Sequence, residues 1–222
     1  MNASDTAPSV VSPGVGHTSD VADLLLLSRW LGAVPEFVTG RGGARIGFIP
    51  TASSIYPDRA WVDLDRRTLR EQGFTVTDID LEILSASETA AALDDVDAVF
   101  VSGGNVFHLL SVLRRTGVDR LLTDRVRAGM LYLGASAGAC VVGADIEPLG
   151  LLDDPTEAPD LTSTTGLGWI DEVIVPHADG IVSGRAVVDE LRIRYGSRFT
   201  LRMLADDQAL LVSGSERSVI SS

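Results

Sequence analysis

A serine flanked by small residues follows an apolar segment near the middle of the chain. Residues 134–138 read Gly-Ala-Ser-Ala-Gly and come directly after the apolar residues 130–133. A serine in a tight turn between a strand and a helix has strained backbone angles and presents its hydroxyl at the sheet edge, where only small neighbours fit. The amide of Ala137 would begin the next helix and could stabilise an oxyanion. The pattern favours Ser136 as a nucleophile over a simple small-residue turn.

A histidine in a comparable position is the candidate base. His177 lies 41 residues after Ser136 and follows the apolar residues 173–176. An imidazole at the end of a strand can accept the serine proton and later pass it to a leaving group. The chain has three histidines. His17 lies near the N-terminus and His108 inside an expected helix, so His177 is the one that this chemistry needs.

A third group should orient the imidazole and fix its tautomer. Among the acids between the serine and the histidine, the candidates for this role are Asp153, Asp154, Glu147 and Glu157. Their residue types and positions alone do not select one of them, since most acids in such a segment are simply solvated.

A glycine-rich segment is the candidate partner of Ala137 in an oxyanion hole. Residues 101–105 read Val-Ser-Gly-Gly-Asn and follow an expected strand. Adjacent glycines let backbone N–H groups point toward a ligand, so Gly104 and Asn105 are expected to line the site. The alternative is an ordinary glycine turn. Neither the dinucleotide-binding glycine pattern nor the phosphate-binding loop pattern is present.

Alternating apolar strands and amphipathic helices must position these residues. Strands are expected at 24–28, 44–50, 74–81, 98–101, 130–134 and 173–175, with two more within 199–213. Helices are expected at 57–72, 87–93, 106–115, 119–128, 139–142 and 185–195, and a long loop at 144–168. This alternation predicts an α/β fold with a mostly parallel central sheet and helices on both faces. Reacting groups in such sheets lie at the carboxyl ends of the strands.

Composition limits the class of protein. The 222 residues are 45% hydrophobic, enough for one domain over 21–222, whereas residues 1–20 are rich in Ser, Pro, Gly and Thr and are expected to be a disordered tail. The net charge of −13 argues against nucleic acid and anionic membranes as partners. With one cysteine, no signal-peptide pattern and no membrane-spanning run, we expect a cytoplasmic protein. Its assembly is open, with a homodimer as one option.

Taken together, the segments resemble the peptidase E family of serine peptidases. The matching pieces, in the order of the family, are the apolar run 24–28, Phe-Ile-Pro at 48–50, the glycine segment with its helix at 101–110, the serine turn at 131–139 and Val-Pro-His at 175–177. The match covers most of the chain. This resemblance implies a class I glutamine amidotransferase-like fold, a flavodoxin-like three-layer sandwich.

The resemblance also implies a function and roles for residues. Ser136 would be the nucleophile and His177 the base. Asp154, or else Asp153, would orient the base, and Gly104 would supply an oxyanion amide. Relatives include aspartyl dipeptidases and cyanophycinases, so the expected activity is hydrolysis of short peptides through an acyl-enzyme, with an N-terminal aspartate as one substrate class.

Some features leave the substrate open. An aspartate side chain needs a cation near the site, and Arg185, with Arg192 and Arg194 after it, is the candidate, unless these arginines form an ordinary solvated face. No metal-ligand pattern is present, so no metal or cofactor is expected. Amidotransferases of this fold carry a cysteine where Ser136 stands, and Cys140 is expected to pack. The alternatives are an ester or amide hydrolase that is not a peptidase, and a catalytically silent binding protein.

Overall fold

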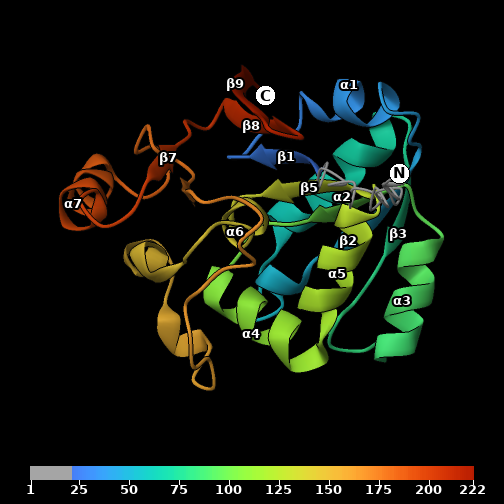
Figure 1. The fold of residues 1–222 in the computed structure, drawn as a ribbon, viewed down its shortest axis with the longest axis horizontal. Coiled ribbons are helices and arrows are strands. Elements are labelled where there is room, and N and C mark those ends of the chain that lie inside the picture. The colour runs from blue at the N-terminus through green and yellow to red at the C-terminus, as the bar shows by residue number, and fades with distance from the viewer. Residues whose placement is uncertain (1–21) are drawn as a thin grey trace, which may run out of the picture.

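The computed structural model describes residues 22–222, so the tail expected at 1–20 lies outside the described residues. A seven-stranded sheet with the order β3-β2-β4-β5-β1-β8-β9 forms its centre (Figure 1). The strands of this sheet are β1 (Asp23–Leu27), β2 (Arg45–Ile49), β3 (Thr75–Asp78), β4 (Ala98–Val101), β5 (Leu131–Ala135), β8 (Gln208–Ser213) and β9 (Glu216–Ser221). A separate two-stranded sheet consists of β6 (Val173–Val175) and β7 (Leu201–Met203).

The first five strands of the large sheet are parallel, as the alternation of strands and helices predicts. β8 pairs antiparallel with β1, and β9 pairs antiparallel with β8. The strand β9 was not expected, because residues 216–221 carry a mainly polar, exposed pattern typical of an edge rather than of a buried strand.

Helices cover both faces of the sheet (Figure 1). They are α1 (Val34–Thr39), α2 (Ala60–Glu71), α3 (Ala86–Asp94), α4 (Val106–Thr116), α5 (Val118–Arg127), α6 (Ala137–Cys140) and α7 (Arg185–Tyr195), with short 3₁₀ turns at Thr51–Ser53, Glu147–Leu151 and Pro155–Glu157. The expected long loop therefore contains two of these turns. The helix α1 was not expected, and α3 is capped by Ser85 rather than by Ser87.

The run of leucines in β1 shows why the sheet must be covered on both sides. Leu24 and Leu26 belong to the apolar core that includes the buried residues of α4 and α5, whereas Leu25 and Leu27 belong to the core that includes those of α1 and α2. Successive side chains of a strand point to opposite faces. A continuous apolar run therefore needs helices on both faces, and the expected three-layer α/β fold is confirmed.

The topology gathers several chain segments at one edge of the sheet. The parallel strands β1, β4 and β5 end there, and the antiparallel β8 begins there, with Ala209 opposite Leu27. The small sheet joins the same edge, because the backbone N–H of His177, just after β6, donates a hydrogen bond to Ser28, just after β1. The segments that follow β1, β4, β5, β6 and β7 thus meet in one region.

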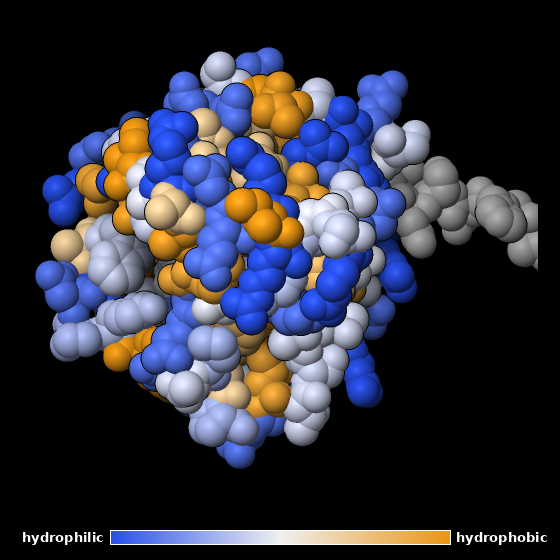
Figure 2. All heavy atoms as spheres, turned by 90° about the vertical axis from the view of Figure 1, so that its left-hand side faces the viewer, coloured by the Kyte–Doolittle hydropathy of each residue, from blue (hydrophilic) through white to orange (hydrophobic). Residues whose placement is uncertain are grey.

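The surface on the side of α7 has no continuous apolar area. Hydrophilic and apolar side chains are interspersed over this face (Figure 2). No helix within residues 22–222 is long and apolar enough to cross a membrane.

Candidate active site

The turn after β5 holds Ser136 in a strained backbone conformation. Its φ is 49° and its ψ is −110°, a region that residues with a Cβ rarely occupy, at a cost of about 1–3 kcal/mol. The flanking glycines are required by space. A Cβ on Gly138 would lie 2.1 Å from the carbonyl oxygen of Val101, and one on Gly134 would lie 2.3 Å from that of Gly138. The Gly-x-Ser-x-Gly pattern thus reflects close packing of the turn against β4.

The structure brings Ser136 and His177 together and adds a carboxylate that the sequence analysis missed. Oγ of Ser136 lies 3.1 Å from Nε2 of His177, and Nδ1 of His177 lies 2.6 Å from Oδ1 of Asp206. Asp206 lies in the turn between β7 and β8 and is buried. A carboxylate at Nδ1 holds the proton on that nitrogen, which leaves Nε2 free to accept the proton of a hydroxyl. The three groups are in the geometry that nucleophilic catalysis by serine needs.

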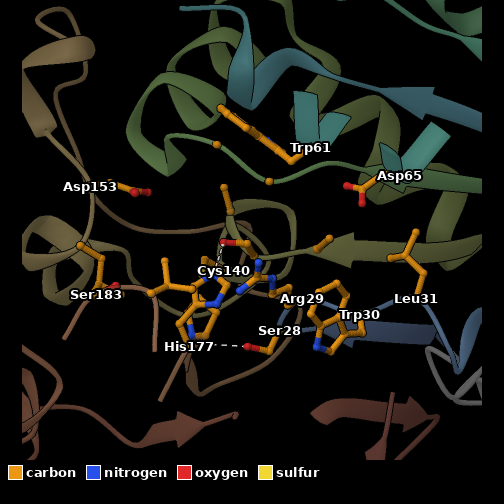
Figure 3. A pocket seen from close by; sticks show the side chains of 18 of the residues that line it. Ser28, Arg29, Trp30, Leu31, Trp61, Asp65, Cys140, Asp153, His177 and Ser183 are labelled. Carbon is orange, nitrogen blue, oxygen red and sulfur yellow. Dashed lines mark hydrogen bonds between the residues drawn. The ribbon is translucent and has the colours of Figure 1, made fainter. Parts of the chain in front are cut away.

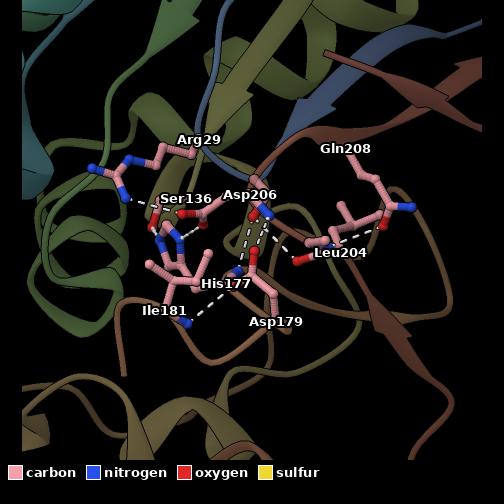
Figure 4. A network of polar contacts seen from close by, with 10 residues as sticks. Arg29, Ser136, His177, Asp179, Ile181, Leu204, Asp206 and Gln208 are labelled. Carbon is pink, nitrogen blue, oxygen red and sulfur yellow. Dashed lines mark hydrogen bonds and ion pairs between the residues drawn. The ribbon is translucent and has the colours of Figure 1, made fainter. Parts of the chain in front are cut away.

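Further polar groups fix this arrangement (Figure 4). Nη1 of Arg29 donates a hydrogen bond of 2.9 Å to Oδ2 of Asp206, the oxygen that His177 does not use. The backbone N–H of Asp206 donates to Oδ2 of Asp179 at 3.0 Å. This bond and one from the N–H of Ile181 hold the pKa of Asp179 below its ordinary value. Both oxygens of Asp206 are therefore engaged, so its orientation is determined.

The backbone of His177 is held as firmly as its ring. Its φ is 56°, a second positive value at a residue other than glycine. Its N–H donates to Oγ of Ser28 at 2.8 Å, and the Ser28 hydroxyl donates to the carbonyl of Leu204 at 3.2 Å. Ser28 is fully buried. It thereby connects the segments after β1, β6 and β7, which carry Arg29, His177 and Asp206.

The expectation that Asp154 orients the imidazole is wrong. Oδ1 of Asp154 accepts hydrogen bonds from the N–H and the hydroxyl of Thr156, so this side chain caps a 3₁₀ turn at the surface. Asp153 accepts from the N–H of Val106 at the start of α4. Glu147 forms an ion pair with Arg198, and Glu157 is exposed in the 3₁₀ turn. Asp153, Asp154 and Glu147 thus contact other groups, and Asp206 already occupies Nδ1 of His177.

The segment after β4 supplies backbone groups to the site. Gly104 has a φ of 146°, and a Cβ there would lie 2.2 Å from the carbonyl oxygen of Ala52, so only glycine fits. A Cβ on Gly103 would lie 3.2 Å from Cβ of Ser136. Within residues 22–222, the N–H groups of Gly104 and Ala137 donate no hydrogen bond. These two N–H groups are thus available to a ligand.

Asn105 was expected to line the site, but it does not line the cavity beside Ser136. Its backbone N–H donates to the carbonyl of Ala52 at 2.7 Å, and its Oδ1 accepts from the N–H of His108, which caps α4. Its Nδ2 donates to the carbonyl of Asp154 at 2.9 Å. Asn105 is buried and joins the glycine segment to residues 153–154, so it positions Gly104 rather than contacting a substrate.

Ser136 and His177 both line a cavity of about 640 Å³. Figure 3 shows His177 and other residues of its wall. Such a volume is typical of a pocket for a small ligand. Its walls include Gly103, Gly104, Ala137, Cys140, His177, and aromatic and acidic side chains from other elements. Burial raises the pKa of the Cys140 thiol, which fits its expected packing role. Among the described residues no group of histidines, cysteines or carboxylates could hold a metal ion.

The expectation that Arg185 lines the site is wrong. Arg185 opens α7 and is exposed, and it does not line the cavity. Within residues 22–222 its guanidinium donates one hydrogen bond, to the carbonyl of Asp179. Arg29 is the one arginine or lysine among the described residues that line it. Arg29 follows β1 directly, so its position after a buried strand was the signal that could have identified it.

Comparisons with known proteins show what the whole chain is similar to. Residues 17–220 match the model of peptidase family S51. An uncharacterised peptidase of Listeria innocua is 32% identical over 197 residues, which cover 87% of this chain and 94% of the relative. Peptidase E of Streptomyces coelicolor is 36% identical over 157 residues, which cover 65% and 60% of the two chains. The crystal structure of a candidate peptidase E protein from Listeria monocytogenes superposes with a TM-score of 0.83 at 27% identity, covering 91% of this chain and 99% of the other.

Proposed function

This chain belongs to peptidase family S51 and is a serine-type peptidase, and from that premise we propose that it hydrolyses short peptides with Ser136 as nucleophile. In this proposal His177 is the general base and acid, and Asp206 orients it. The observation that carries the proposal is the continuous set of contacts from Oγ of Ser136 through both imidazole nitrogens to a buried carboxylate. No other carboxylate of the described residues contacts either imidazole nitrogen.

The proposed reaction begins with acylation. Nε2 of His177 accepts the hydroxyl proton as Oγ of Ser136 bonds to the peptide carbonyl carbon, and the carbonyl oxygen becomes an oxyanion. The N–H groups of Gly104 and Ala137 are the donors that we assign to this oxyanion, because they have no other acceptor in the described chain. The imidazolium then protonates the amine nitrogen as the C–N bond breaks, which leaves an ester on Ser136.

Deacylation repeats these steps with water. His177 accepts a proton from a water molecule whose oxygen attacks the ester carbonyl, and then returns the proton to Oγ of Ser136 as the acid product leaves. Asp206 keeps its negative charge throughout and stabilises the imidazolium in both steps. Arg29 and Asp179 act only through Asp206, so we assign them positioning roles.

The substrate class follows from the size and charge of the cavity. A volume of about 640 Å³ accommodates a peptide of a few residues rather than a folded chain. An N-terminal aspartate would need a cation, and Arg29 is the one that lines the cavity in residues 22–222. Because Arg29 already binds Asp206, the lining supports hydrolysis of short peptides more strongly than selectivity for aspartate.

A panel of dipeptides tests this proposal. We expect the wild type to release free amino acids from some members of the panel, and Ser136→Ala to lose at least three orders of magnitude in kcat/KM. Ser197→Ala is the matched control, since Ser197 is an exposed serine after α7 and should leave the rates unchanged. Equal rates for the wild type and Ser136→Ala would refute the assignment of the nucleophile.

A further inference from the structure

One face of α2 forms a wall of the cavity. Trp61, Leu64, Asp65 and Thr68 of this helix all line it. Their spacing of three, four and seven residues places them on one side of a helix. The other charged residues of this helix do not line the cavity. Among them, Asp63 and Arg66 form an ion pair of 2.7 Å outside it. A single carboxylate of α2, that of Asp65, therefore faces the substrate space.

Asp65 has no partner in the described part of the chain. No hydrogen bond or ion pair is formed by its carboxylate, although the residue is only partly exposed to solvent. Burial alone raises the pKa of Asp65 to about 7 from its ordinary value of 3.8. Burying an acid without a partner is unfavourable. A group that is neither paired nor fully solvated, and that faces a cavity next to a nucleophile, is suited to bind part of a substrate.

The surroundings of Asp65 suit a side chain that is apolar along its length and charged at its end. Leu31 and Leu64 line the same cavity, and Trp61, one helical turn before Asp65, is 40% exposed. The rings of Tyr56 and Trp61 pack edge to face, with their centroids 5.8 Å apart. Aromatic faces attract cations, and the aliphatic stems of lysine and arginine pack on apolar surfaces.

The other charged groups of the cavity also favour a cationic side chain as the ligand of Asp65. Asp153 enters from the side opposite to Asp65 (Figure 3), and burial raises the pKa of Asp153 to about 6. Arg29 also lines the cavity, but its guanidinium is bound to Asp206 and stacks on Trp30 at 4.6 Å. Two carboxylates, Asp65 and Asp153, therefore line the cavity, against one arginine. Since that arginine is bound to Asp206, no lining arginine or lysine of the described residues pairs with Asp65.

We propose that Asp65 is a specificity determinant that selects peptides with a positively charged group, an alkylammonium or a guanidinium, bound between its carboxylate and the ring of Trp61. This inference rests on the proposed peptidase function. It names the substrate class of the same cavity and assigns Asp65 no part in the bond-breaking steps.

Two series of dipeptides, X-Ala and Ala-X, test the inference, with X as lysine, arginine or norleucine. Norleucine has a linear aliphatic side chain without the charge. We expect kcat/KM to be roughly tenfold higher for lysine or arginine than for norleucine in at least one series. Asp65→Asn should bring this ratio close to one, and Asp65→Glu should retain most of it. N-acetylated peptides form a separate arm. If acetylation lowers kcat/KM in the wild type but not in Asp65→Asn, the charged group that Asp65 binds is the α-ammonium of the peptide.

Controls separate a role in selectivity from a role in folding. Asp63→Asn removes the same charge from the same helix outside the cavity, and it should leave the lysine-to-norleucine ratio unchanged. Binding of the uncleaved peptides to Ser136→Ala, measured by calorimetry, should show the same preference for lysine. A preference in binding without any turnover by the wild type would overturn the proposed function alone. Equal kcat/KM for lysine and norleucine, or a ratio that survives in Asp65→Asn, would overturn the role of Asp65.

Discussion

Replacing Asp206 by asparagine removes the charge that stabilises the imidazolium and keeps the shape of the side chain. The acceptor oxygen lies 2.6 Å from Nδ1 of His177. At an effective dielectric constant of about 20, two unit charges at that distance attract by about 6 kcal/mol. Arg29, 2.9 Å from the same carboxylate, offsets part of this stabilisation. We therefore expect Asp206→Asn to lower kcat by about 10³- to 10⁴-fold.

The assay is steady-state hydrolysis of a dipeptide that the wild type cleaves, with KM measured separately from kcat. Because Asp206 does not line the cavity, KM should change little. Asp154→Asn is the matched control, since Asp154 is the acid that the family resemblance favoured and it caps an exposed turn. It should retain kcat within about twofold. A large loss in Asp154→Asn together with near-normal rates in Asp206→Asn would refute the assignment of the orienting carboxylate.

Three further outcomes are expected. Because Ser136 has a φ of 49°, Ser136→Gly should be more stable than Ser136→Ala by about 1–2 kcal/mol in chemical denaturation, and equal stabilities would argue against strain. Arg29→Gln should lower kcat roughly tenfold with little change in circular dichroism, because Asp206 loses one of its two side-chain partners, and an unchanged kcat would remove its positioning role. Asp65 holds its proton to about pH 7 when folded but ionises near 3.8 when unfolded, so the free energy of unfolding should fall as pH rises between these values. Asp65→Asn should remove this loss, which is at most about 4 kcal/mol, and an identical pH profile in wild type and variant would contradict the burial of this carboxyl.

The nucleophile turn and the main sheet could be predicted because local constraints determine them. Gly134 and Gly138 are needed because backbone carbonyl oxygens lie where a Cβ would be placed on either residue. This requirement is visible in the sequence as a pattern of glycines around Ser136. The leucines of β1 likewise require cover on both faces, whatever the strand order. Patterns of this kind involve residues that are close in the chain, so they can be recognised in one sequence without knowledge of the fold.

The orienting carboxylate could not be predicted because it depends on contacts between distant segments. Asp206 lies 29 residues after His177, and the two meet only because β6 and β7 pair in parallel and β8 starts beside the end of β1. Strand order is not encoded in local alternation of apolar residues. The available signal was weak: Asp206 follows the short strand β7 as His177 follows β6, at the carboxyl end where reacting groups gather.

The same reasoning explains the misplacement of the cation. Arg185 was expected near the site because it follows His177 in sequence, but α7 carries it to the surface. Arg29 lies far from both Ser136 and His177 in the chain, and it reaches them because β1 is the neighbour of β5 in the sheet. Closeness to His177 in the sequence therefore did not identify Arg29, which acts on the imidazole by binding Asp206.

Covalent labelling of Ser136 by a fluorophosphonate, followed by mass spectrometry of the modified peptide, tests the central claim most directly. We predict a single modification on Ser136 in the wild type, a much slower reaction in His177→Ala and in Asp206→Asn, and none in Ser136→Ala. Modification of a different residue, or equal labelling rates in the wild type and His177→Ala, would contradict an activated serine at this site.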